Sequence, residues 1–233
     1  MSRVGHTALL GVVLSACVGS AGYRDLAHDE IDVRDVVLPA GARAGMFITW
    51  SVDERDPDDE SLVEETIACV ERTAQRVTIE WRTTWHGGRS SVVAARFAPD
   101  GTVLGAWRGP PGREAVRLRL MELEFDADEA KDEADRAGKT IGVSTDDVDI
   151  DQETVVEDVE TPAGTFRCVR RTIKAQLLFV KMRDDMWFAA EGALPLSRVV
   201  KTKSTAPMGY RVDRVVTKYG TSGARPTLTL PKG

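Results

Sequence analysis

Cys17 is the residue best placed for chemistry, because its thiol stands where an export signal ends. The chain begins with a positive charge at Arg3, continues through an apolar run from Thr7 to Leu14, and then places the small residues Ser15 and Ala16 before the cysteine. That order is typical of a secretory signal. The apolar run is too short to cross a membrane, which takes about 20 residues. The sequence therefore predicts export.

The tetrad Leu14-Ser15-Ala16-Cys17 resembles the lipobox of bacterial lipoproteins. The resemblance implies that residues 1–16 are a signal peptide that is removed, and that Cys17 receives the lipid, a fatty acid such as palmitate. It also implies a protein that faces the periplasm of a bacterial cell envelope and is held to the membrane through covalent lipid. Val18, in place of aspartate, favours the outer over the inner membrane by the same resemblance. An ordinary signal peptide is the alternative, and it leads to the same compartment.

The other groups that could do chemistry form no recognisable catalytic motif. The histidines are His6 in the signal, His28 and His86, and no H-E-x-x-H or G-x-S-x-G motif is present. Asp147, Asp149 and Asp151 have the spacing of a calcium loop, but Gln152 stands where that loop needs glycine. The alternative for these aspartates is a solvated acidic sheet edge. We expect no enzymatic activity, no cofactor and no metal.

Two cysteines remain after the signal, Cys69 and Cys168. In an oxidising compartment such a pair can form a disulfide. The alternative is two buried thiols that pack as small hydrophobic side chains. A bridge needs the two Cα atoms within about 7 Å, which the sequence alone does not decide.

The composition describes a soluble globular body. Of the 233 residues, 42% are hydrophobic and 29% charged, and the formal net charge is −6. A chain of this length has enough residues for one domain with a core, or for two small ones. An acidic protein gains nothing from counterion release on nucleic acid, so we expect no nucleic-acid partner.

From Met46 onward the dominant hydrophobic period is two. Val77, Ile79 and Trp81 alternate with polar residues, and Pro99-Asp100-Gly101 is a strong hairpin signal. The sequence predicts a mainly β fold, a single curved antiparallel sheet or half-barrel. The expected strands are 46–52, 66–72, 77–85, 92–97, 102–107, 139–144, 153–160, 165–174, 185–189, 198–204 and 210–219.

This sheet is expected to fill residues 44–220, between a flexible tether over residues 17–43 and a loose tail over residues 221–233. The tether is rich in glycine and charge, and the tail holds Pro226 and Pro231. One helical excursion is expected near residues 113–137. Alanines at helical spacing support its second half, whereas Val116, Leu118 and Leu120 in the first half also fit a strand.

The second half of the chain resembles a group of poorly characterised bacterial envelope proteins. The segment from Val159 to Cys168 matches their V-x-x-P-A-G-T-F-x-C hairpin, Trp187-Phe188-Ala189 matches an aromatic strand, and Tyr219-Gly220 ends the last strand as theirs does. The acidic stretch in the middle departs from the pattern. The resemblance implies a half-barrel similar to bacterial lipoprotein carriers, and it supplies no catalytic residues.

Four tryptophans in the expected strands are the candidates for ligand binding. They either line a groove for an apolar ligand or fill the core of the sheet. The chain is therefore expected to be a non-enzymatic envelope lipoprotein that binds an apolar ligand or an envelope partner. The alternatives are a scaffold that acts only through surface contacts, or an enzyme of unknown type. The four tryptophans are Trp50, Trp81, Trp85 and Trp187.

Overall fold

The computed structural model describes residues 30–33, 36–55, 62–121, 149–177, 180–205 and 210–231. Within these ranges the chain forms twelve β-strands and no α-helix. None of the described residues belongs to a helix long and apolar enough to span a membrane. The strands are β1 (Glu30–Asp32), β2 (Phe47–Arg55), β3 (Leu62–Arg72), β4 (Val77–Trp85), β5 (Ser90–Phe97), β6 (Val103–Gly109), β7 (Val116–Met121), β8 (Asp149–Thr161), β9 (Gly164–Leu177), β10 (Val180–Ala189), β11 (Val199–Thr205) and β12 (Arg211–Gly220).

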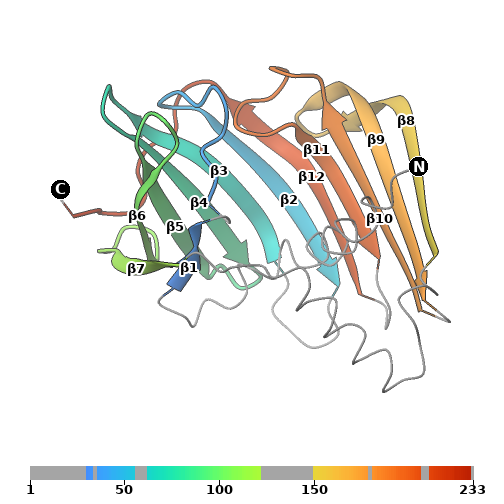
Figure 1. The fold of residues 1–233 in the computed structure, drawn as a ribbon, viewed down its shortest axis with the longest axis horizontal. Coiled ribbons are helices and arrows are strands. Elements are labelled where there is room, and N and C mark those ends of the chain that lie inside the picture. The colour runs from blue at the N-terminus through green and yellow to red at the C-terminus, as the bar shows by residue number, and fades with distance from the viewer. Residues whose placement is uncertain are drawn as a thin grey trace, which may run out of the picture.

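All twelve strands belong to one open sheet (Figure 1), in the order β1-β7-β6-β5-β4-β3-β2-β12-β11-β10-β9-β8. The short β1 pairs with β7 in parallel, and the other described pairings are antiparallel. Short turns join β3 to β4, β4 to β5, β5 to β6 and β8 to β9; Gly101, with φ 93°, supplies the left-handed conformation between β5 and β6. The expected single, mainly β sheet is confirmed, and so is the hairpin at Pro162-Ala163-Gly164 between β8 and β9.

The expected helical excursion near residues 113–137 is not supported. Its first part is the strand β7, in which Leu118 pairs with Ala106 of β6, and Leu120 pairs with Ile31 of β1. The two-residue alternation of Val116, Leu118 and Leu120 therefore decided the local structure. Residues 122–137, with the alanines, lie outside the described residues, as does the expected strand over residues 139–144.

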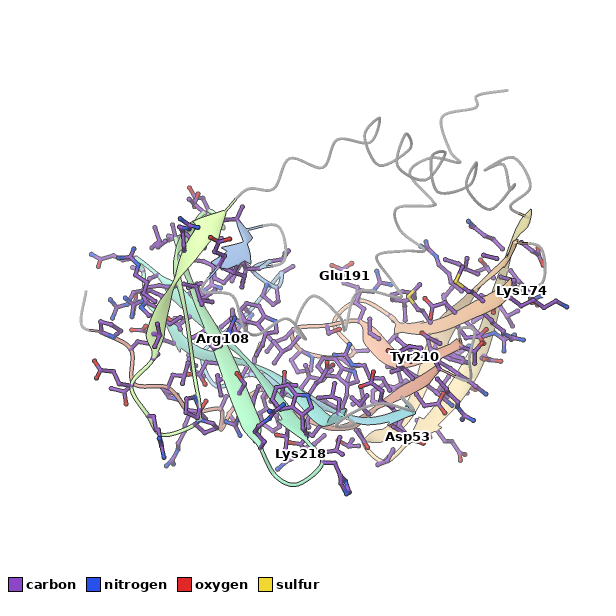
Figure 2. The ribbon with its side chains drawn as sticks, turned by 90° about the horizontal axis from the view of Figure 1, so that it is seen from below. Asp53, Arg108, Lys174, Glu191, Tyr210 and Lys218 are labelled. Atoms are coloured by element: carbon purple, nitrogen blue, oxygen red, sulfur yellow. The ribbon has the colours of Figure 1, made fainter. Side chains whose placement is uncertain are left out.

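The sheet is bent into a U, which Figure 2 shows end on. Asp53 and Lys218 lie on the outer side of the bend (Figure 2). Because side chains alternate along a strand, Ile48, Trp50 and Val52 of β2 face the inner side. The register continues this inner side from Ile48 through Ile67 of β3 to Trp81 of β4.

Two buried clusters occupy the bend. The β4 cluster packs under β3 to β7, and the β2 cluster packs where β2, β12 and β11 meet the start of β9 and the end of β10. Ile67 and Leu196 contact both clusters. The β4 cluster includes Cys69, Val77, Ile79, Val93, Ala95, Phe97, Ala106 and Leu118; the β2 cluster includes Ile48, Trp50, Val159, Phe166, Cys168, Trp187, Ala189, Leu194, Val200 and Val216.

The expected tether does not extend to residue 43, because its last part is built into the fold. The strand β1 adds to the sheet at β7, and Val36 and Ala42 are buried in the β4 cluster. The Ala42 carbonyl also accepts a hydrogen bond from the Arg72 guanidinium. The apolar residues between Ile31 and Ala42 therefore cover one arm of the sheet. Residues 17–29 lie outside the described part of the chain.

The expected loose tail is likewise wrong for residues 224–231. Leu228 is buried on the outer side of the sheet with Val92, Ala94 and Trp107. Backbone hydrogen bonds link Gly112 N–H to the Thr227 carbonyl at 2.8 Å and Ala115 N–H to the Thr229 carbonyl at 3.3 Å. The prolines of this segment exclude a regular strand, but they do not prevent it from packing in an extended form.

The segment between β10 and β11, residues 190–198, is called the inner loop here. Glu191, at its start, lies on the inner side of the bend in Figure 2. Leu194 is buried in the β2 cluster, and Leu196 packs against both clusters. The inner loop therefore lies on the inner side of the bend and packs against the clusters of both arms.

Candidate functional site

The inner loop and the aromatic side chains around it form the candidate site. The base of the loop is closed by two hydrogen bonds between the same residues. Ala189 N–H donates to the Arg198 carbonyl at 2.8 Å, and Arg198 Nε donates to the Ala189 carbonyl at 3.1 Å. Beyond this base the loop is held chiefly through the apolar side chains of Leu194 and Leu196.

Leu196 has a strained backbone. Its φ is 63°, the positive value that a non-glycine residue rarely adopts. Ser197 N–H donates to the Pro195 carbonyl at 2.8 Å, so the chain makes a three-residue γ-turn of the strained kind. Residues held in sparsely populated regions cost about 1–3 kcal/mol each and persist where packing enforces them. Here the packing of the Leu196 side chain against the β4 and β2 clusters stabilises the strained backbone conformation.

Trp50 forms the floor beneath the inner loop. It is 1% exposed, and its indole N–H donates to the Val199 carbonyl at 3.0 Å, directly after the loop. The Arg214 guanidinium lies 4.1 Å from the centre of the Trp50 ring. Arg214 Nη2 also contacts Glu65 Oε2 at 2.7 Å. An ion pair stacked on an aromatic ring therefore borders the apolar interior.

Trp187 lies in the same buried cluster as Trp50. Its indole N–H donates to Glu157 Oε1 at 2.6 Å. Arg170 approaches the same carboxylate at 3.5 Å. Lys201 Nζ lies 5.1 Å and Arg170 Cζ 6.0 Å from the Trp187 ring centre. The ring is therefore fixed by polar neighbours on its edge and by cations on its faces.

Trp81 and Trp85 complete the set of four tryptophans. Trp81 faces the β4 cluster, and its ring lies at an edge-on angle to Phe97 with centroids 6.5 Å apart. Trp85 belongs to a separate cluster with Val52 and Leu62. Trp50 and Trp187 thus belong to the β2 cluster and Trp81 packs against the β4 cluster, the two clusters that Leu196 contacts, whereas Trp85 belongs to neither. All four pack against buried clusters, which is the core-packing alternative, and the groove remains a proposal.

The two cysteines do not form a disulfide. Cys69 lies in the β4 cluster and Cys168 in the β2 cluster, both as buried free thiols. Four strands separate β3 from β9 in the sheet order. Burial raises the pKa of both thiols, and for Cys168 the charges of Glu157 and Asp158 raise it further. For Cys69 the charge of Arg72 acts in the opposite direction. Both buried thiols are therefore expected to stay protonated at neutral pH.

The remaining sequence candidates lie apart from this site. Cys17 and His28 are outside the described residues, and His86 is exposed in the turn after β4. Asp149 and Asp151 belong to β8, where Lys174 Nζ lies 3.4 Å from Asp151 Oδ2. Among the residues that the structure describes, no three His, Cys, Asp or Glu side chains are placed to hold a metal.

Two adjacent carboxylates on β10 have opposite electrostatic environments. Burial raises the pKa of Asp184, and the negative charge of Asp185 raises it further. The hydrogen bond that Ser204 donates at 2.7 Å acts in the opposite direction, but it does not outweigh them. Burial also acts to raise the pKa of Asp185, but hydrogen bonds from Arg183 and Thr172 outweigh it and lower that pKa. These distances are 2.7 Å for Arg183 Nε and 2.5 Å for Thr172 Oγ1. Asp185 is therefore an anion held by its partners.

The residues missed by sequence reasoning are the inner loop, Arg214 and Glu65. The register of β12 on β2 places Arg214 opposite Val52 and Val216 opposite Trp50. Once these two strands are aligned, Arg214 is therefore seen to face the inner side of the sheet. The order of strands in the sheet was needed for that alignment. Pro195 beside Leu194 and Leu196 was the remaining sign of a buried turn in the loop.

No protein-family model and no curated protein matches this chain. The chain is weakly similar to several solved structures, among them the following three. A protein described as exported, with a YmcC-like fold, from Bacteroides fragilis is 11% identical, with a TM-score of 0.35 over 80% of this chain and 100% of that one. A protein described as a lipoprotein from Parabacteroides distasonis is 13% identical, with a TM-score of 0.29 over 76% and 96% of the two chains. LprF from Mycobacterium bovis is 11% identical, with a TM-score of 0.30 over 78% and 88%.

Proposed function

We propose that this protein is a non-enzymatic lipoprotein of the bacterial cell envelope, anchored through Cys17, that holds an apolar ligand inside the bend of its sheet. The inner loop is the element that the ligand displaces. One observation carries the proposal: a loop with a strained backbone at Leu196 packs against the apolar clusters of both arms, mainly through two leucine side chains.

The energetics favour such an exchange. A ligand chain that replaces Leu194 and Leu196 restores the apolar contacts of the clusters, at about 0.8 kcal/mol for each buried methylene. Release of the Leu196 γ-turn returns about 1–3 kcal/mol of backbone strain. Against this stands the cost of immobilising the ligand. An acyl chain of ordinary length supplies enough methylenes to meet that cost.

A test of ligand binding uses protein extracted from its own membranes in mild detergent and examined by native mass spectrometry. The proposal predicts a retained non-covalent adduct with the mass of an acyl-chain lipid, lost when the protein is denatured. The matched control is the Leu194→Asp variant, which keeps the anchor and disturbs the apolar contacts of the site. No adduct on the wild type, or equal adducts on both proteins, would argue against a ligand at this site.

The anchor is tested separately through Cys17. Replacement of Cys17 with serine is expected to move the protein from the membrane fraction to the soluble periplasmic fraction and to abolish labelling by radioactive palmitate. Separation of inner from outer membranes then checks the expected outer-membrane position. Membrane association that persists in the Cys17→Ser variant would contradict covalent anchoring.

A scaffold that acts through surface contacts is the second candidate, and one observation favours it. The tryptophans around the inner loop already have packed surroundings, with Trp50 1% and Trp187 8% exposed. A sheet whose interior is permanently filled has no need of a ligand. The two functions differ in whether the inner loop ever leaves its place.

A further inference from the structure

Residues 224–231, called the tail segment here, lie on the outer side of the sheet in the way that a bound peptide lies on its receptor. They run beside residues 112–115, which lead into β7. Ala115 N–H donates to the Thr229 carbonyl at 3.3 Å, and Thr229 N–H donates to the Arg113 carbonyl at 3.4 Å, which is the pattern of a parallel pair. Extended peptides that add to the edge of a sheet are held by main-chain hydrogen bonds of this kind.

Alternate side chains of the tail segment pack onto the sheet. Leu228 is buried, Leu230 packs against the same cluster, and Thr229 between them is exposed. Because alternate side chains of an extended chain lie on one side, the segment presents two leucines to the sheet. The side chains that surround Leu228, together with Glu80, are called the receptor here. The receptor consists of Glu80, Val92, Ala94, Trp107 and Ala115.

The receptor is incomplete without the tail segment. Glu80 is buried, and the register places it beside Ala94, which in turn lies beside Trp107. In the described part of the chain, the hydrogen bonds to the Glu80 carboxylate all come from Thr227 and Leu228. A buried carboxylate is costly unless hydrogen bonds satisfy it. The receptor therefore favours an extended chain that supplies a hydroxyl, two successive backbone N–H groups and a leucine.

The tail segment is joined to the end of β12 by a short connection, residues 221–223. Gly223 has a φ of 100°, and a Cβ atom added there would meet no other atom within 4 Å. The first bond of the tail segment to the body, from Ala224 N–H to the Gly45 carbonyl at 2.9 Å, follows this connection. Hinges are a few residues between elements that absorb changes in backbone angles. A rotation within residues 221–223 would carry the whole tail segment away from its own receptor.

We propose that the receptor accepts the tail segment of a second copy of this chain, so that two copies exchange residues 224–231. The exchanged segment is identical, so every contact that it makes in one copy is reproduced in the dimer, which makes such an exchange a low-cost route to a dimer. The segment of the same copy competes at a high effective concentration, so exchange increases with protein concentration and when the copy's own segment is weakened. The proposal depends neither on a lipid at Cys17 nor on a ligand inside the bend.

Peptide binding tests the receptor. A fluorescein-labelled peptide with the sequence of residues 224–231 is titrated with the full-length Cys17→Ser protein, with and without Leu228→Asp, and its anisotropy is measured. Leu228→Asp weakens the protein's own tail segment, so this variant is expected to bind the peptide about tenfold or more tightly than the parent, which competes through its own segment. Ala94→Arg, which fills the pocket of Leu228, is expected to abolish binding.

A second variant guards against loss of the fold. Leu230→Asp changes a leucine that is only half-buried, and with either variant the peptide is expected to raise the midpoint of thermal unfolding. Absence of peptide binding to both variants, or binding that Ala94→Arg leaves intact, would overturn the receptor.

Exchange between copies is tested by mixing two variants of the full-length Cys17→Ser protein. Leu228→Asp has an intact receptor and a defective tail segment, whereas Ala94→Arg has a blocked receptor and an intact tail segment. We expect analytical ultracentrifugation to show a dimer of one copy of each in the mixture and monomers in each variant alone, because the mixture alone brings an intact receptor and an intact tail segment together. A mixture that stays monomeric while Leu228→Asp binds the peptide, or a dimer formed by Ala94→Arg alone, would overturn the exchange.

Discussion

The Thr227 backbone N–H donates to both carboxylate oxygens of Glu80, at 3.0 and 3.1 Å, although 147 positions separate the two residues. Thr227 Oγ1 adds a bond of 2.5 Å and Leu228 N–H one of 3.2 Å. Glu80 is only 3% exposed. A buried carboxylate is costly unless hydrogen bonds satisfy it, so the C-terminal segment and β4 depend on each other.

Removal of either partner is expected to destabilise the whole body. Leu228→Ala leaves a cavity beside Trp107 and should cost about 2–5 kcal/mol of unfolding free energy. Glu80→Ala leaves the tail amides without their acceptor and should cost about 1–3 kcal/mol. Urea unfolding measures both, with Glu64→Ala at an exposed position of β3 as the control. A change no larger than that of the control would show that the tail does not contribute to stability.

The strained backbone at Leu196 is expected to reverse the usual order of stability of an alanine and a glycine substitution. At an ordinary position alanine is more stable than glycine by about 0.5–1 kcal/mol. With φ at 63° the Cβ atom itself costs about 1–2 kcal/mol. Both variants lose the packing of the leucine side chain. Thermal unfolding should therefore show that Leu196→Gly is more stable than Leu196→Ala. Alanine more stable than glycine here would contradict the strained γ-turn.

Asp184 and Asp185 should respond oppositely to pH. The raised pKa of Asp184 means that its ionised form is disfavoured in the folded state, a cost that is full above the folded pKa and absent below the unfolded value of 3.8. Asp184→Asn is thus expected to be neutral or stabilising at pH 7, with the advantage disappearing as the pH falls toward 3.8.

The lowered pKa of Asp185 has the opposite consequence. Its stabilising charge is present above the unfolded value of 3.8 and is lost as the pH falls through the lower folded pKa. Asp185→Asn should therefore be destabilising at pH 7 by about 1–3 kcal/mol, and the difference should shrink in acid. Unfolding free energies between pH 3 and pH 7 check the pair; parallel curves for the two variants would refute this electrostatic assignment.

Two tryptophans form a matched pair for the hydrogen bond beneath the inner loop. Trp50 Nε1 donates to the Val199 carbonyl, whereas the buried Nε1 of Trp107 meets no acceptor in the described part of the chain. Trp50→Phe should therefore cost about 1 kcal/mol more than Trp107→Phe, as measured by urea unfolding. Equal costs would show that the bond to Val199 does not hold the end of the loop.

The sequence predicted the strands well because their side chains alternate. The alternation of Val77, Ile79 and Trp81 gave β4 its observed limits, and the hairpin signals at Gly101 and Gly164 placed the turns between β5 and β6 and between β8 and β9. The same rule, applied to Val116 and its neighbours, would have avoided the expected helix over β7. Local periodicity is thus enough to predict a strand where one of its sides is buried and the other faces solvent.

Contacts between distant segments were not visible in the sequence. The burial of Leu228 depends on an acceptor at Glu80, and the position of Leu196 depends on two clusters formed by other strands. The prolines near the C-terminus suggested a loose tail, because the sequence does not show which groups hydrogen-bond to the backbone of this segment. The sequence left open whether the four tryptophans line a groove or fill the core, and it did not show the inner loop that packs beside them.

The central claim is that an apolar ligand displaces the inner loop, and tryptophan fluorescence tests it most directly. The full-length Cys17→Ser protein is titrated with a long-chain fatty acid and, separately, with a phospholipid. The account predicts a saturable change that survives in Trp107→Phe, whose ring lies on the outer side, and that is reduced in Trp50→Phe, whose ring lies beneath the loop. No saturable change with either lipid, or a change that Trp50→Phe leaves intact, would contradict the account.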